Sequence, residues 1–155
     1  MRILILVFVA TVIGLASGCA TPPSSPSGPR FAGVENTPSD KALVYVYRPK
    51  RVVVGAYGWL EIFIDGKSLG KLRNANYAME SVSPGVHLFQ YRFSRPLPGP
   101  VVVPTSALSE AASSDGPKVE FRLEAGKVYY IVYPAQKLVD ESKGLKDLKD
   151  CHAMK

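Results

Sequence analysis

The sequence lacks the patterns that mark the best-known active sites. It has no G-x-S-x-G elbow to hold a nucleophilic serine and no glycine-rich loop of the kind that cradles phosphate groups. It contains only two histidines and two cysteines. These residues make no convincing catalytic set, so we expect a protein that is not an enzyme and that uses no cofactor.

The few groups suited to chemistry have simpler interpretations. His87 begins a predicted strand just after a turn, where a cross-strand hydrogen bond is favoured over a role as general base. Asp150, Cys151 and His152 are neighbours in sequence, whereas a zinc site draws its ligands from spaced pairs, so no metal site is expected. These three residues are expected on a frayed C-terminal end. Cys151 is interpreted as buried and inert, with an intermolecular disulfide as the alternative.

A long hydrophobic run is also missing. The uncharged stretch from Ile3 to Ala16 is shorter than the roughly 18 residues that a membrane-spanning helix needs, and no basic cluster follows it. Arg2 precedes the stretch and small residues follow it, which is the architecture of a secretory signal. We therefore predict that residues 1–18 are a signal peptide and not part of the fold.

The segment Leu15-Ala16-Ser17-Gly18-Cys19 resembles the lipobox of bacterial lipoproteins. The resemblance implies cleavage between Gly18 and Cys19 and covalent attachment of lipid to the Cys19 sulfur. The match departs from the commonest pattern, because Ala16 stands where leucine is usual and Leu15 lies one residue earlier. Several acyl chains, at about 0.8 kcal/mol for each buried CH₂, would hold the chain on a membrane permanently. The alternative is an ordinary signal peptide with an incidental cysteine.

The lipobox resemblance also implies a location. Ala20 follows the cysteine, where an aspartate would resemble the inner-membrane retention signal of enterobacterial lipoproteins. We therefore expect a lipid-anchored protein of the bacterial cell envelope, at the outer membrane and facing the periplasm. The net charge of +6 does not indicate nucleic acid as a partner, because an exported chain meets little of it. Headgroups, lipopolysaccharide phosphates and cell-wall carboxylates are the anionic surfaces there, although scattered basic residues favour an ordinary solvated surface.

Composition divides the rest of the chain in two. Residues 19–40 include the run Thr21-Pro22-Pro23-Ser24-Ser25-Pro26-Ser27-Gly28-Pro29, which has too little apolar surface to offset its ordering entropy. They are predicted to form a disordered, semi-extended tether that begins with the acylated cysteine. Residues 41–155 are predicted to form one domain.

The pattern of this domain is one of short strands. Trp59–Ile64 alternates between two faces, and Asp65-Gly66 after it is a strong hairpin signal. About seven strands with turns between them are typical of a sandwich or barrel. A short amphipathic helix, weakened by Gly144, is predicted over residues 138–150. The predicted strands cover residues 42–48, 59–64, 67–72, 77–82, 86–93, 119–123 and 128–133, with an edge strand at 101–103 and a turn of helix at 106–112 inside a proline-rich insertion, 94–117.

Several segments of the domain carry a family resemblance. They are Ala42-Leu43-Val44-Tyr45-Val46-Tyr47-Arg48-Pro49, Ile64-Asp65-Gly66-Lys67-Ser68-Leu69-Gly70, Tyr77, Ser83-Pro84-Gly85-Val86-His87 and Glu124-Ala125-Gly126-Lys127-Val128-Tyr129-Tyr130. Together they resemble the DUF2846 domain, a family of uncharacterised proteobacterial lipoproteins. The central part is also similar to PEGA domains, which are small sandwiches of surface and envelope proteins. The resemblance implies an all-β fold, an immunoglobulin-like or transthyretin-like β-sandwich, with no agreed activity.

One surface is a candidate for binding. Arg48, Arg51, Tyr57 and Trp59 are close in sequence, and an exposed rim of aromatic and basic side chains could stack on sugars or meet a partner protein. The alternative is that Trp59 and Phe63 fill the second face of a sandwich strand. We therefore expect a non-enzymatic module that binds or scaffolds an envelope protein or a cell-wall glycan. A self-assembling structural subunit and an enzyme acting on cell-wall material are the alternatives.

Overall fold

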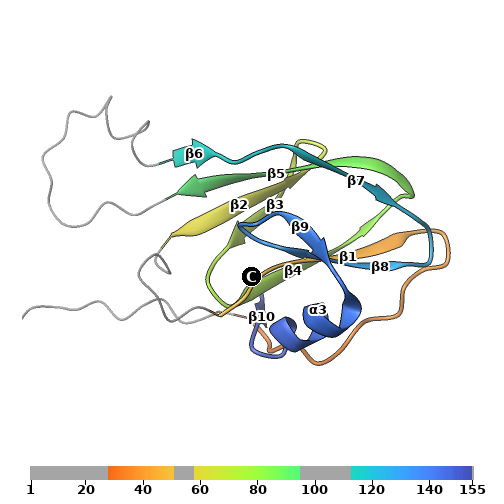
Figure 1. Cartoon of the computed structure of the whole chain (residues 1–155). Coiled ribbons are helices and arrows are strands. Elements are labelled where there is room, and N and C mark those ends of the chain that lie inside the picture. Colours follow the sequence, from red (N-terminus) through yellow and green to blue (C-terminus); the bar gives the residue numbers. More distant parts are fainter. Residues whose placement is uncertain (1–27, 51–57, 95–112, 155) are drawn as a thin grey trace, which may run out of the picture.

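The computed structural model describes residues 28–50, 58–94 and 113–154 (Figure 1). The predicted signal peptide, its cleavage site and the predicted acylation site Cys19 lie outside these residues, as do Arg51, Tyr57 and the predicted elements of the insertion. No helix within the described ranges is long and apolar enough to cross a membrane. The elements in chain order are β1 (Ala42–Arg48), β2 (Trp59–Ile64), β3 (Lys67–Leu72), β4 (Asn76–Val82), β5 (Gly85–Ser94), β6 (Ser113–Asp115), β7 (Val119–Leu123), β8 (Val128–Val132), β9 (Lys137–Val139), α3 (Glu141–Leu148) and β10 (His152–Ala153).

The strands form two sheets that pack face to face (Figure 1). Sheet A has the strand order β10-β4-β1-β8-β9, and sheet B has the order β3-β2-β5-β6, with β7 also paired to β5. Within sheet A, β1 is antiparallel to β4 but parallel to β8. The all-β sandwich with one short C-terminal helix is confirmed. Each of the seven predicted strands is present, whereas β6, β9 and β10 were not predicted.

The space between the sheets is filled by one face of each strand. Leu60, Ile62 and Ile64 are buried on β2, as the alternation predicts. They belong to one cluster with Val44 of β1 and Phe89 of β5. Each such side chain contributes about 1.5–3 kcal/mol when it is removed from water, so this cluster is the main source of stability for the sandwich.

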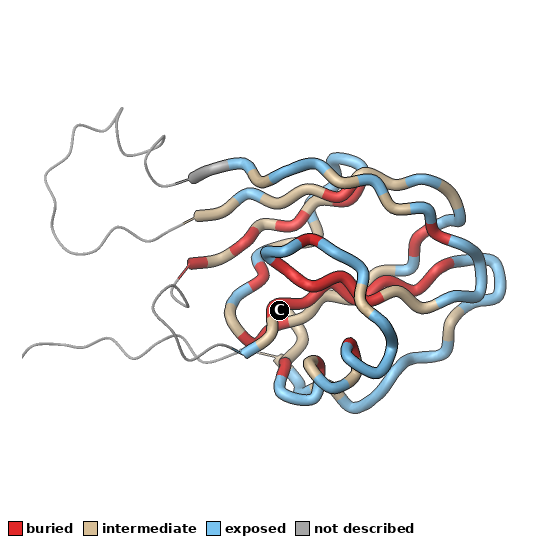
Figure 2. Tube along the Cα trace, viewed as in Figure 1, coloured by how far each residue is buried: buried red, intermediate tan, exposed pale blue. Residues whose placement is uncertain are grey.

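Strand β1 is buried on both of its faces (Figure 2). Val44 faces sheet B, whereas Tyr45 and Tyr47 face the other side of sheet A, where they belong to a second cluster with residues of α3. The Tyr47 hydroxyl donates a hydrogen bond of 3.0 Å to the carboxylate of Asp147 in α3. The sequence of β1 is therefore a continuous apolar run, which is typical of a central strand covered on both sides.

Residues 28–40 contact the domain, although the sequence predicted a disordered tether as far as residue 40. The Phe31 ring meets Tyr45 and Tyr77 edge-on, with ring centroids 5.8 and 5.6 Å apart. The backbone N–H of Glu35 donates a hydrogen bond of 3.0 Å to the Tyr45 hydroxyl. The tether prediction is wrong for this part of the chain. It was based on the overall composition of a proline- and serine-rich segment, and composition does not show that a single aromatic residue, Phe31, packs against the sheet.

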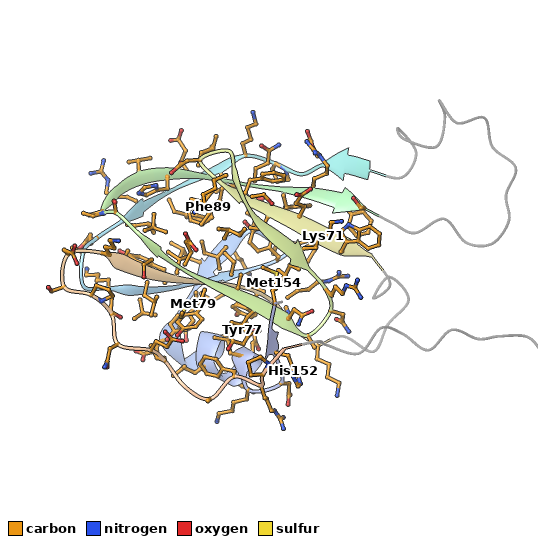
Figure 3. The ribbon with its side chains drawn as sticks, turned by 180° about the vertical axis from the view of Figure 1, so that it is seen from behind. Lys71, Tyr77, Met79, Phe89, His152 and Met154 are labelled. Carbon is orange, nitrogen blue, oxygen red and sulfur yellow. The ribbon has the colours of Figure 1, made fainter. Side chains whose placement is uncertain are left out.

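The C-terminal segment is held between β4 and the N-terminal segment. β10 pairs in parallel with the start of β4, and on its other side the Ala153 N–H donates to the Pro29 carbonyl at 2.8 Å. The Phe31 N–H donates to the Cys151 carbonyl at 3.0 Å. Figure 3 shows His152 beside Tyr77 at this edge of sheet A. The expected frayed end at residues 150–152 is therefore wrong, because backbone pairing on both sides orders it.

Helix α3 is shorter than the predicted span of 138–150. It begins after Asp140, whose carboxylate accepts a hydrogen bond of 2.9 Å from the Lys143 N–H, a common way to cap the start of a helix. Leu138 was assigned to the apolar face of this helix, but it belongs to β9 and is 41% exposed. The cap explains why the helix cannot extend back to Leu138.

Gly144 allows α3 to approach sheet A closely. The residue is buried, and a Cβ atom built on it would lie 2.4 Å from the Tyr130 ring of β8. That distance is far shorter than a normal contact between carbon atoms. The glycine that lowers helix propensity is therefore required by packing.

We expect Gly144→Ala to lower the free energy of unfolding by about 1–3 kcal/mol, because the added methyl group must displace Tyr130. Helix propensity alone predicts the opposite sign, a gain of about 1 kcal/mol. Urea denaturation monitored by circular dichroism measures the difference. Lys146→Ala on the exposed side of the helix is the control and should change stability by less than about 0.5 kcal/mol. A stabilised Gly144→Ala variant would show that the helix does not pack this closely.

Phe31→Ala tests the docking of the N-terminal segment. We expect a loss of about 2 kcal/mol in the free energy of unfolding, because two edge-on ring contacts and part of the buried area disappear. Val34→Ala, at a residue that is 40% exposed, serves as the matched control and should have little effect. Equal stability of the two variants would mean that residues 28–40 behave as a free tether.

Candidate functional site

A pocket opens between the two sheets, at the end of the sandwich where β1 ends and β2 begins. Its volume is about 270 Å³, close to the lower limit of typical ligand pockets. The walls come from both sheets and from the segments that follow β6 and β8. The lining residues are Arg48, Leu60, Tyr91, Phe93, Asp115, Gly116 and Pro134.

Arg48 brings a positive charge to this pocket. Arg48 lies four residues after Val44 on β1 and therefore on the same face of the strand, so its side chain points between the sheets. The residue is only 7% exposed. One guanidinium nitrogen donates a hydrogen bond of 2.7 Å to the carbonyl of Gly58, just before β2. A guanidinium stays charged at any physiological pH and carries five N–H donors in a planar fork. This geometry suits the binding of a carboxylate or phosphate group.

Two aromatic residues of β5 form an apolar wall. Tyr91 and Phe93 lie on the inner face of the strand, and the Tyr91 ring meets the Tyr133 ring edge-on at 5.6 Å. A Cβ atom at Gly116 would lie 2.4 Å from the Tyr91 ring, and one at Gly58 would lie 2.7 Å from the Phe93 ring. Both glycines therefore give the rings the space that they occupy.

The lining groups are suited to recognition. The carboxylate of Asp115 accepts a hydrogen bond of 2.9 Å from Arg92, which lies on the outer face of β5. Asp115 is thus bonded to the outer face of sheet B, whereas the Arg48 side chain points between the sheets. A ligand that combines a negative charge with an apolar or ring-shaped part would match a guanidinium beside two aromatic rings.

A scan against protein-family models finds a match over residues 38–144, to a family described as a protein of unknown function, DUF2846. The chain belongs to the DUF2846 family. Searches of curated proteins and of solved structures found no significant match. The pocket residues from Arg48 to Pro134 all fall inside the matched region, so the pocket is a feature of the DUF2846 domain and not of the segments around it.

The structure of this DUF2846 domain separates the residues of the predicted binding surface. Arg48 lines the pocket, whereas Trp59 lies on the outer face of sheet B, and Arg51 and Tyr57 are outside the described residues. Trp59 is partly exposed, and the ammonium group of Lys71, a residue of β3 labelled in Figure 3, lies 5.4 Å from the centroid of its ring. Trp59 and Phe63 therefore lie on the second face of the sandwich strand, as the alternative interpretation expected, although both remain partly accessible.

Sequence reasoning missed most of the pocket. Tyr91 and Phe93 alternate along β5, which could have placed them on the inner face, but nothing local showed that they reach an open end. Gly116 lies inside the proline-rich insertion, 94–117, where the sequence carried no signal for a binding site. Pro134 follows a predicted strand, and only the pairing of β8 with β1 brings it near Arg48.

His87 lies toward the other end of the DUF2846 domain. One ring nitrogen is 2.7 Å from the carboxylate of Asp65 in the β2–β3 turn, and the other is 2.7 Å from the Ser83 carbonyl. Asp65 also accepts a hydrogen bond from the Leu88 N–H, and its pKa is lowered mainly by the hydrogen bond from His87. The predicted cross-strand hydrogen bond is confirmed, and it ties the turn to β5.

Cys151 is buried beneath the outer layer of the DUF2846 domain. Its thiol lies 3.4 Å from the Asp147 carbonyl and 3.7 Å from the Arg48 carbonyl, and burial raises its pKa to about 12. Since the thiolate is the reactive form of cysteine, such a thiol reacts slowly. The described residues contain no group of three or more acidic, histidine or cysteine side chains that could hold a metal ion.

In a Cys19→Ala background, we expect Cys151 to react with iodoacetamide at least about a hundredfold more slowly in the folded protein than in urea. Both burial and the raised pKa reduce the amount of accessible thiolate at mildly alkaline pH. Mass spectrometry of timed samples gives the rates. A second cysteine at the exposed position Ser81 provides the fast-reacting control. Similar rates at both positions would contradict the burial of Cys151.

Proposed function

We propose that the chain is a lipid-anchored, non-enzymatic binding module of the bacterial cell envelope, with the Arg48 pocket as its binding site. The lipobox-like segment ending at Cys19 supports the anchor, and the proline- and serine-rich residues after it support a spacer. The pocket supports the binding role. The ligand is a negatively charged group of an envelope protein or of the cell wall, joined to an apolar part.

The observation that carries this proposal is the buried guanidinium of Arg48 beside aromatic walls. Burying a charge is costly, and an apolar residue could fill this position of a sandwich strand without that cost. Arg48 lines a pocket and directs its charged side chain between the sheets, where a guanidinium can bind a carboxylate or phosphate group of a ligand. His87 lies away from this pocket and bonds to Asp65 and Ser83, so it offers no base for a reaction there.

Crosslinking in intact cells that express the tagged chain tests the proposal, followed by mass spectrometry of the recovered partners. We expect a reproducible partner protein or cell-wall fragment that is lost from a Cys19→Ala chain. Arg48→Lys should reduce its recovery at least about tenfold, because lysine keeps the charge but loses the planar fork.

Arg122→Gln is the matched control for Arg48→Lys, because it alters an exposed arginine of β7, toward the opposite end of the sandwich, that does not line the pocket. The thermal midpoint of each variant is measured, so that a loss of fold is recognised. Recovery of only self-crosslinked chains would contradict the proposal and favour a self-assembling subunit. Equal recovery of the partner from both arginine variants would show that the Arg48 pocket is not the binding site.

A further inference from the structure

The N-terminal segment leaves the domain at the same end as the pocket. The register of sheet A places Arg30 opposite His152, His152 opposite Asn76, and Asn76 opposite Arg48. Neighbouring strands lie about 4.8 Å apart, so three strand spacings place Arg30 roughly 14 Å from Arg48 along this row. The first described residue, Gly28, stands two residues before Arg30.

The distance from this end to the predicted lipid is short. From Cys19 to Gly28 there are nine residue steps (28 − 19), and a fully extended chain of that length spans at most about 30 Å. A tether as far as residue 40 would reach more than twice as far, but residues 28–40 contact the domain. If Cys19 carries lipid, the end of the sandwich with the pocket is therefore the end nearest the membrane.

Exposed basic residues are distributed across this end of sheet A. Lys50 follows β1, Arg73 precedes β4, Lys137 begins β9 and Lys149 precedes β10, and all four are exposed together with Arg30. We call these five residues the basic end. They extend from the β10 edge of sheet A to its β9 edge, so they can meet a flat surface together. Asp150, which is 3.0 Å from Arg30, offsets one of these charges.

Two basic residues at the opposite end of the sandwich have acidic partners. In the β7–β8 turn, Lys127 is 2.7 Å from Glu124. Beside the β2–β3 turn, Lys67 is 3.3 Å from Glu80 of β4. Lys41 and Arg122 also lie at this end, but the two ion pairs make its positive charge less concentrated than that of the end where the tether leaves.

We propose that the basic end docks on the anionic surface of the membrane that holds the chain, so that the pocket opens at the membrane surface. The inference rests on the proposed lipid anchor. Basic side chains are attracted to an anionic leaflet when they lie within about a Debye length of it, roughly 8–10 Å. A short tether keeps the basic end within reach of that range. The ligand of the pocket is then a component presented at the membrane surface, and not one that diffuses freely.

Trp59 is a natural reporter for this orientation. It is the only tryptophan of the chain, it is partly exposed, and it follows Gly58, which bonds to Arg48 at the pocket end. The full acylated chain is reconstituted in vesicles of phosphatidylethanolamine and phosphatidylglycerol that carry a nitroxide on a headgroup. We expect quenching of Trp59 fluorescence that falls at least about twofold in neutral phosphatidylcholine vesicles or at high salt.

Two sets of variants test the basic end. Lys50→Gln, Arg73→Gln and Lys137→Gln combined remove three charges from it, and we expect Trp59 quenching to fall at least about twofold. The matched control removes the same charge from the other end, with Lys41→Gln, Arg122→Gln and Lys127→Gln, and should keep the parental quenching. A second reporter, Trp59→Phe with Val86→Trp, places the fluorophore at the opposite end of β5, at a residue that is 52% exposed, and should be quenched less.

The mass of the reconstituted chain separates this inference from the proposed function. A mass without acyl groups would overturn the lipid anchor and with it the inference. An acylated chain that quenches equally from Trp59 and from position 86 would overturn the orientation alone. Equal quenching by the two triple variants would likewise overturn the role of the basic end, while the anchor would stand.

Discussion

The double burial of β1 is the constraint on which the rest of the structure depends. A strand with apolar residues on one face needs one covering layer, but β1 needs two, because Val44 and Tyr45 point in opposite directions and both are buried. Sheet B supplies the first layer. Helix α3 and the segment around Phe31 supply the second, which explains why a proline-rich stretch becomes part of the domain.

The same strand determines the character of the pocket. Side chains alternate between the two faces of β1, and the last residue of the strand is on the same face as Val44. Its side chain must therefore point between the sheets. That residue is Arg48, which lines the pocket together with Leu60 and two aromatic residues of sheet B. The guanidinium is held by the Gly58 carbonyl, which fixes the start of β2 relative to the end of β1. Fold and candidate site therefore share one structural cause.

Local patterns were enough to predict the elements that depend on local signals. The alternation of β2 and the Asp65-Gly66 turn predicted a hairpin that the structure contains. Strand β10 could not be predicted, because it has only two residues and pairs with β4, which is distant in sequence. The docking of Phe31 could not be predicted either, because one of its ring contacts, Tyr77, lies more than 40 residues away. Amino-acid composition describes a segment as a whole, whereas the position of the Phe31 ring depends on tertiary packing.

The candidate site was predictable only in part for the same reason. Arg48 was recognised because it belongs to a basic stretch that lies close in sequence to Tyr57 and Trp59. Its neighbours in the pocket come from β2, β5, β6 and two connecting segments, and only the topology of the sheets brings them together. Trp59 was grouped with Arg48 by closeness in sequence, yet the alternation of β2 directs its ring to the outer face.

The pairing of the two ends of the described chain has a consequence for biosynthesis. Arg30 bonds to residues 119 and 120 positions later, and β10 fills the gap between the N-terminal segment and β4. Contacts between segments so distant in sequence form late, because closing the intervening loop costs entropy. A nascent chain therefore cannot complete this edge of sheet A until the ribosome has made residue 153. The N-terminal segment therefore stays without its partner strand through almost the whole of synthesis.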